Sequence, residues 1–188
     1  MCNGSIMDKL ISFSLPLMVS GILQLAFNAV DIIVVGRFSG SQALAAVGSN
    51  GPVISLLINL FLGISMGANV VISNHIGQKD NNLTKDAIRT TAATALFSGL
   101  ALAVIGVLAA RPILTIMGTP TEVLDMAVRY LRIYFIGTPF LLIYNFGSAI
   151  LRSKGDTSRP LYILIIAGII NTVLNLILVI GFHMGVAG

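Results

Sequence analysis

Long hydrophobic runs separated by short charged segments dominate this chain. From Leu10 to Gly36 the only charged side chain is Asp31, and no Asp, Glu, Lys or Arg occurs in residues 38–78, 90–110, 133–151 or 160–182. A helix that crosses a bilayer needs roughly 20 mostly apolar residues. The pattern predicts an all-α polytopic membrane protein, a bundle of about five transmembrane helices near residues 10–36, 50–75, 88–110, 126–151 and 160–182.

Short polar connections join the predicted spans. The first, FSGSQALAAVGSNGP, has enough alanine to be partly helical. Gly118 and Pro120 are turn signals in the third connection, and Gly155 with Asp156 marks the turn in the fourth. We therefore expect neighbouring spans to run in opposite directions, with no linker between soluble domains.

Composition agrees with a membrane protein whose partner is the lipid bilayer. The chain is 56% hydrophobic and 10% charged, with a mean hydropathy of +0.96, whereas soluble domains carry about 25% charged residues. The net charge is +4, but the basic residues form no stripe, so we expect no nucleic-acid partner. The single cysteine, Cys2, excludes an internal disulfide and a multi-cysteine metal site.

Basic residues predict the orientation, because cytoplasmic loops carry an excess of Lys and Arg. Of the 11 basic residues, seven fall on one side of the predicted spans: Lys9, Lys79, Lys85, Arg89, Arg152, Lys154 and Arg159. The other four, on the opposite side, are Arg37, Arg111, Arg129 and Arg132. We expect a multi-pass protein of the plasma (inner) membrane with a cytoplasmic N-terminus.

Asp31 is costly in such a segment, since a charge at the bilayer centre costs at least about 2.5–3.5 kcal/mol. Ser20, Gln24, Asn28 and Asp31 follow spacings that put them on one face of a helix. An acid on such a polar face can take up and release a proton, or bind a hard cation together with amide oxygens. The alternative is an Asp near the interface that simply reaches water.

The fifth span carries a second polar face, with Asn171 and Asn175 at i and i+4. Asp31 lies fifteen residues after Pro16, and Asn175 lies fifteen residues after Pro160. Both helices are predicted to run from inside to outside, so we expect Asp31 and Asn175 at a similar depth in the outer half of the membrane.

The fourth span adds Tyr134, Thr138, Asn145 and Ser148 on one face. Aligned polar faces on several helices predict a hydrated substrate cavity, to which Asn28 also belongs. The competing interpretation is that these side chains only hold helices together, at roughly 0.6 kcal/mol per hydrogen bond.

Two further features concern helix shape and packing. Gly63 and Gly67 fit a small-xxx-small pattern, which predicts close helix packing. Pro16 removes a backbone hydrogen bond within the first span and permits a kink, either as a hinge or as a static bend.

Several motifs resemble the N-terminal half of a MATE-family multidrug exporter. They include GRFSGSQALAAVGS, LRSKGDTSRP and IINTVLNLILVIG, and the resemblance extends over essentially all 188 residues. It implies a twelve-helix transporter with two six-helix lobes. Residues 1–188 would then form an incomplete N-terminal lobe, with the sixth helix and the C-terminal lobe of the same protein absent. We would not expect such a piece to transport alone.

The resemblance implies secondary active multidrug efflux, in which cationic amphipathic drugs or dyes leave in exchange for H⁺ or Na⁺. It implies no enzyme activity and no cofactor beyond the coupling ion. It places cation coupling at Asp31, Asn171 and Asn175, with Na⁺ as one candidate ion there, a cavity-lining role at Gln24 and a bending role at Pro16. Some relatives carry Asp at the position of Asn175, so this chain has one carboxylate where they have two.

Three other functions compete with drug efflux. A lipid-linked sugar flippase of the same superfamily would need a more basic cavity, and no Lys or Arg lies mid-span. A membrane-embedded enzyme would need a nucleophile and a base, but His75 and His183 lie at span ends, and Asp31 has no His, Cys or Glu on its face. An assembly subunit without transport would tolerate an uncharged residue at position 31.

Overall fold

The computed structural model describes residues 6–182 and 184–185, so Cys2 and His183 lie outside the described residues. Five long helices follow one another, and a short π-helical turn extends the last. They are α1 (Ile6–Phe38), α2 (Gly40–Gly77), α3 (Asn81–Ile116), α4 (Thr121–Ser153), α5 (Ser158–Leu176) and η1 (Ile177–Gly181). All five helices are long and apolar enough to cross a membrane. The predicted fold class is confirmed.

The helices extend further than the sequence predicted. α2 starts at Gly40, because the alanine-rich connection that we expected to be partly helical is helical almost throughout. α3 starts at Asn81, where the Asp80 carboxylate accepts hydrogen bonds from the backbone N–H groups of Asn82 and Leu83, both at 3.0 Å. Such a cap satisfies donors that have no partner within the helix.

The predicted turns have the backbone geometry that their residues favour. Gly118 and Gly155 adopt positive φ values of 74° and 83°, which glycine reaches without steric cost. Lys79, between α2 and α3, takes the same left-handed conformation at φ 58° without that freedom. The two glycine turns are therefore confirmed.

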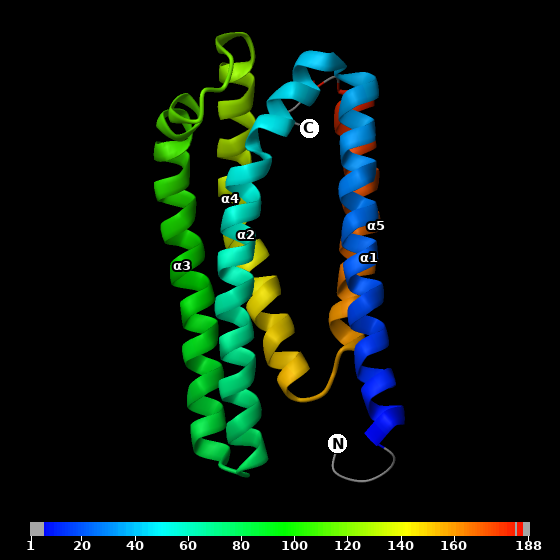
Figure 1. Cartoon of the computed structure of the whole chain (residues 1–188), viewed down its shortest axis with the longest axis vertical. Helices are drawn as coiled ribbons and strands as arrows, with labels where there is room; N and C mark the ends of the chain where they lie inside the picture. Colours follow the sequence, from blue (N-terminus) through cyan, green and yellow to red (C-terminus); the bar gives the residue numbers. More distant parts are fainter. Residues whose placement is uncertain (1–5, 183, 186–188) are drawn as a thin grey trace.

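The helices form two groups (Figure 1). α2 and α3 both pack against α4, whereas α1 packs along α5. The two groups meet where α1 continues into α2 and, sparsely, where α4 connects to α5. The first turns of α2 lean over toward the end of α1 (Figure 1). Consequently the α1–α5 pair is a distinct unit beside the three-helix group.

The hydrophobic core belongs to the three-helix group, and α3 approaches α4 closely at two glycines. A Cβ atom added at Gly99 would lie 2.7 Å from the Cα atom of Pro139, and one added at Gly106 would overlap the ring of Phe135. The buried core residues are Ala46, Ala95, Ala110, Leu114, Val123, Ala127, Val128, Leu131, Phe135, Leu142 and Phe146. Side chains from α2, α3 and α4 thus fill two apolar clusters, and Leu102 packs against both.

Asn50 adds a polar bond to this apolar interface. Its Nδ2 donates to the carbonyl oxygen of Ala46 on its own helix at 2.8 Å and to that of Ala127 on α4 at 3.2 Å. The side chain is fully buried. Asn50 therefore fastens α2 to α4, a role that the sequence analysis did not predict.

The expected packing at Gly63 and Gly67 is wrong for the described residues. Both glycines are exposed, and a Cβ atom added at either would have nothing within 4 Å. On α3, by contrast, Gly99 and Gly106 allow close approach to α4. A small-xxx-small spacing shows that two helices are able to approach closely, but not which face is covered.

We predict that Gly106→Ala destabilises the three-helix group. The added methyl group meets the Phe135 ring inside a packed interface, and overpacking of this kind costs about 1–3 kcal/mol. The free energy of unfolding in mixed micelles titrated with sodium dodecyl sulfate measures the effect. The matched control is Gly63→Ala, which adds the same methyl group in open space. Equal stability of the two variants would contradict the packing described above.

Candidate functional site

Asp31 and Asn175 meet between α1 and α5. The Nδ2 of Asn175 donates a hydrogen bond to the Oδ1 of Asp31 at 2.6 Å. The two residues are 144 positions apart in the chain, yet both lie fifteen residues after a proline. The predicted similarity in depth is therefore confirmed.

Close packing between the two helices supports this contact. A Cβ atom at Gly168 on α5 would overlap the ring of Phe27 on α1. Phe27 precedes Asp31 by about one helical turn, and Gly168 precedes Asn175 by about two. Because the backbone of α5 can approach the Phe27 ring, the short Asp and Asn side chains reach each other.

The electrostatic surroundings of the Asp31 carboxylate are simple. Asp31 is half-buried, and no basic side chain of the described residues lies within 4 Å of its carboxylate. The Oδ1 of Asn175 is buried and has no hydrogen-bond partner among the described residues. One amide therefore presents its donor to the carboxylate and keeps an unused acceptor beside it.

The other predicted residues of the α1 and α5 faces are not part of this contact. Gln24, Asn28 and Asn171 are exposed, and no hydrogen bond joins Asn171 to Asp31. The hydroxyl of Ser20 donates to the carbonyl oxygen of Pro16 at 2.7 Å, within α1 itself. The polar face of α1 is real, but only Asp31 is bonded across to α5.

Pro16 lies inside an unbroken α1. It provides no N–H for the carbonyl of Ser12, and the Ser20 hydroxyl bonds to the carbonyl of Pro16 itself. Hydroxyl bonds of this type often bend helices. The hinge role of Pro16 stays a prediction.

The cavity residues predicted on α4 lie elsewhere. Tyr134, Thr138 and Asn145 line a space of about 10 Å³ at the interface with α2, which is close to the minimum for one water molecule. The Thr138 hydroxyl donates to the carbonyl of Tyr134 at 3.2 Å. In this conformation these residues do not meet Gln24 or Asn28, because α1 and α4 do not pack together.

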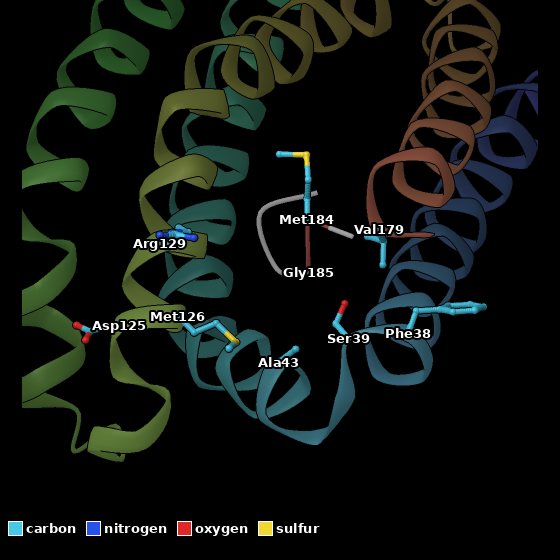
Figure 2. A pocket seen from close by; sticks show the side chains of 9 residues that line it. All are labelled: Phe38, Ser39, Ala43, Asp125, Met126, Arg129, Val179, Met184 and Gly185. Atoms are coloured by element: carbon cyan, nitrogen blue, oxygen red, sulfur yellow. The ribbon is translucent and has the colours of Figure 1, made fainter. Parts of the chain in front are cut away.

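A much larger pocket of about 490 Å³ lies at the end of the bundle where α1 continues into α2 (Figure 2). We call it the outer pocket, since the predicted orientation puts this end outside the cell. Three parts of the chain line it: the α1–α2 corner, the first turns of α4, and η1 with the residues after it. The lining residues are Phe38, Ser39, Ala43, Asp125, Met126, Arg129, Val179, Met184 and Gly185. None of them was predicted as a site residue, because they come together only through the fold.

The described residues hold no cluster of three or more His, Cys, Asp or Glu side chains that could bind a metal ion. The acidic chemistry between α1 and α5 is therefore limited to one carboxylate with an amide neighbour. A carboxylate oxygen and an amide oxygen are both ligand types that hard cations accept.

Comparison with known proteins gives a consistent result. A family model described as MatE matches residues 16–177. The chain is 37% identical over 169 residues to the probable multidrug resistance protein YoeA of Bacillus subtilis (strain 168), covering 90% of this chain and 36% of that protein. It is 31% identical over 188 residues to the probable multidrug resistance protein YpnP of the same strain, covering 99% and 42%.

Solved structures agree with this result. A crystal structure of MATE in complex with MaL6 is similar with a TM-score of 0.91 at 27% identity, covering 98% of this chain and 41% of that chain. An outward-facing multidrug resistance MATE family transporter has a TM-score of 0.88 at 27% identity, covering 95% and 40%. The chain thus spans about two fifths of the length of these relatives.

We predict that Asp31 and Asn175 are energetically coupled. In a double-mutant cycle of Asp31→Ala and Asn175→Ala, the coupling in the unfolding free energy should be about 0.6–1.7 kcal/mol, the range for interhelical bonds in membranes. The charged acceptor favours the upper part of that range. The control cycle replaces Asn175→Ala by Asn171→Ala, one turn earlier on the same helix, and should be additive within about 0.5 kcal/mol. Coupling of the same size in both cycles would show that the hydrogen bond is not its source.

Proposed function

Since the chain belongs to the MatE family, we propose that it serves secondary active multidrug efflux, in which cationic amphipathic compounds leave the cell in exchange for H⁺ or Na⁺. Relatives named as multidrug resistance proteins support the transport of drugs. The observation that carries ion coupling is the hydrogen bond from Asn175 to Asp31 between two apolar spans. The Asp31 site would couple ion movement to drug release, with the remaining length of the protein completing the drug cavity.

The amide of Asn175 gives this pair two states. With the carboxylate ionised and no cation bound, the Nδ2 of Asn175 donates to Asp31 at 2.6 Å. A proton on Asp31 turns the carboxyl into a donor, and a bound Na⁺ requires oxygen ligands. In either case the amide is better placed with its oxygen toward Asp31, and the Oδ1 of Asn175 has no other partner in the part of the chain that the structure describes.

Rotation of the amide is a local event. To affect transport, it must shift the equilibrium between two arrangements of a larger structural element. Asp31 and Asn175 join α1 to α5, and this pair meets the three-helix group mainly at the α1–α2 corner. We therefore expect cation binding to alter how α1 sits on α5, with Pro16 as the point where α1 bends. If cation binding weakens drug binding by some factor, reciprocal linkage requires that bound drug weaken cation binding by the same factor.

The orientation fits the same proposal. The start of α1, the α2–α3 turn and the α4–α5 turn all lie at one end of the bundle (Figure 1), and these segments carry the larger share of basic residues. We assign this end to the cytoplasmic side of the plasma membrane. The α1–α2 corner and the outer pocket then face outside.

We predict that Asp31→Asn abolishes ion-dependent efflux of ethidium from cells that express the whole protein. The substituted amide is nearly isosteric but cannot be protonated or carry the charge that attracts a cation. Ethidium retention is measured by fluorescence after the cells are loaded and energised. Asp8→Asn is the matched control, because it removes the exposed acid in the first turn of the same helix. Efflux that persists in Asp31→Asn with its ion dependence intact would remove Asp31 from the mechanism.

A further inference from the structure

Two charged side chains line the outer pocket and are not part of the proposed coupling site. Asp125 and Arg129 both line it from α4. The Asp125 carboxylate is engaged by Arg111 of α3, with Nη2 and Oδ1 3.5 Å apart. Within the described chain, no carboxylate oxygen lies within 4 Å of the Arg129 guanidinium. Arg129 therefore makes no ion pair within the described chain, whereas Asp125 on the same wall belongs to an exposed pair with Arg111.

Arginine at this position favours a particular kind of ligand. Its planar guanidinium presents several N–H donors that match two oxygens of a carboxylate or phosphate. Arg132, one turn further along α4, has other contacts. Its Nε donates a hydrogen bond to the carbonyl oxygen of Val107 at 3.2 Å, and the residue does not line the pocket. The two arginines are thus neighbours in sequence with different surroundings.

A second polar group on the opposite wall lacks a partner. The Oγ of Ser39 is shielded from solvent and makes no hydrogen bond within the described chain. Figure 2 shows this hydroxyl pointing from the α1–α2 corner into the space beside Gly185. Ser39 therefore adds a hydroxyl beside the pocket whose hydrogen-bonding capacity the described chain does not use.

The other lining side chains among the described residues are apolar. Phe38 and Ala43 come from the α1–α2 corner, Met126 from α4 and Val179 from η1. Methionine adapts its shape to different apolar groups. The volume of about 490 Å³ is within the range of about 300–1,000 Å³ found for small-molecule sites. The pocket therefore combines an anion-binding side with an apolar side.

We propose that the outer pocket binds an amphipathic acid, whose carboxylate or phosphate contacts Arg129 and whose apolar body lies against Met126 and Val179. The ligand class is opposite in charge to the cationic drugs of the proposed transport. The site is also separate from the Asp31–Asn175 pair, so its existence does not depend on efflux.

The test measures binding of 2-naphthoate, a soluble aromatic carboxylate, to the protein in phosphatidylcholine nanodiscs, with empty nanodiscs as the blank. Equilibrium dialysis followed by fluorescence gives the dissociation constant. We expect saturable binding that Arg129→Gln weakens at least tenfold, or about 1.4 kcal/mol. Arg129→Lys should lose less affinity for 2-naphthoate than Arg129→Gln, because lysine keeps the positive charge although it lacks the planar guanidinium.

Two controls make the result specific. Arg132→Gln removes the neighbouring arginine that does not line the pocket, and it should leave naphthoate affinity within about twofold. The neutral 2-naphthamide should bind more weakly than naphthoate and be insensitive to Arg129→Gln. Equal affinity for acid and amide, or equal losses in Arg129→Gln and Arg132→Gln, would overturn the proposal. Circular dichroism of each variant in nanodiscs checks that the helices are intact.

The acid group could belong to a membrane lipid or to a soluble compound, and competition separates the two sources. If lysophosphatidic acid displaces naphthoate from the wild-type protein and lysophosphatidylcholine does not, the pocket accepts an acidic lipid headgroup. If neither lipid displaces naphthoate while Arg129→Gln still weakens its binding, the ligand is a free amphipathic acid. Both outcomes are consistent with a site for an amphipathic acid. Only the measurements with 2-naphthamide and with the arginine variants can overturn the proposal.

Discussion

Inside a bilayer, each polar group must find a partner within the protein, because hydrocarbon offers none. Helices satisfy the backbone, so the remaining polar side chains help to decide which helices meet. Asn50 donates to a carbonyl of α4, and Asn175 donates to the carboxylate of Asp31 on α1. These two amides fasten α2 to α4 and α5 to α1. The two hydrogen bonds lie one within the three-helix group and one within the helix pair, in agreement with the division of the bundle.

Apolar packing completes each unit without joining the two. Glycines on α3 face Pro139 and Phe135 of α4, and Gly168 on α5 faces Phe27 of α1. No comparable glycine contact ties α1 to α4, and α4 meets α5 only sparsely, with the Tyr144 hydroxyl donating to the carbonyl oxygen of Pro160 at 3.3 Å. The interfaces within the units are therefore tight, whereas the boundary between them rests on short segments. A change at the Asp31–Asn175 bond is more easily absorbed at that boundary than inside either unit.

The sequence predicted much of this arrangement, because charge-free runs mark spans and equal spacing from Pro16 and Pro160 puts Asp31 and Asn175 at one depth. It did not reveal Asn50, which stands in a stretch rich in Gly, Pro and Ser that resembles a connection but is helical. The bond of the Ser20 hydroxyl to Pro16 and the open faces of Gly63 and Gly67 were also missed. Periodicity identifies a face of a helix, but partners on other helices decide what that face does.

The outer pocket was hidden for the same reason, and its location beside η1 bears on the rest of the molecule. Val179 lines the pocket and is buried within η1, which begins two residues after Asn175. A π-helical turn holds more residues per turn than an α-helix and often occurs at functional sites. η1 therefore lies between the outer pocket and the turn of α5 that carries Asn175.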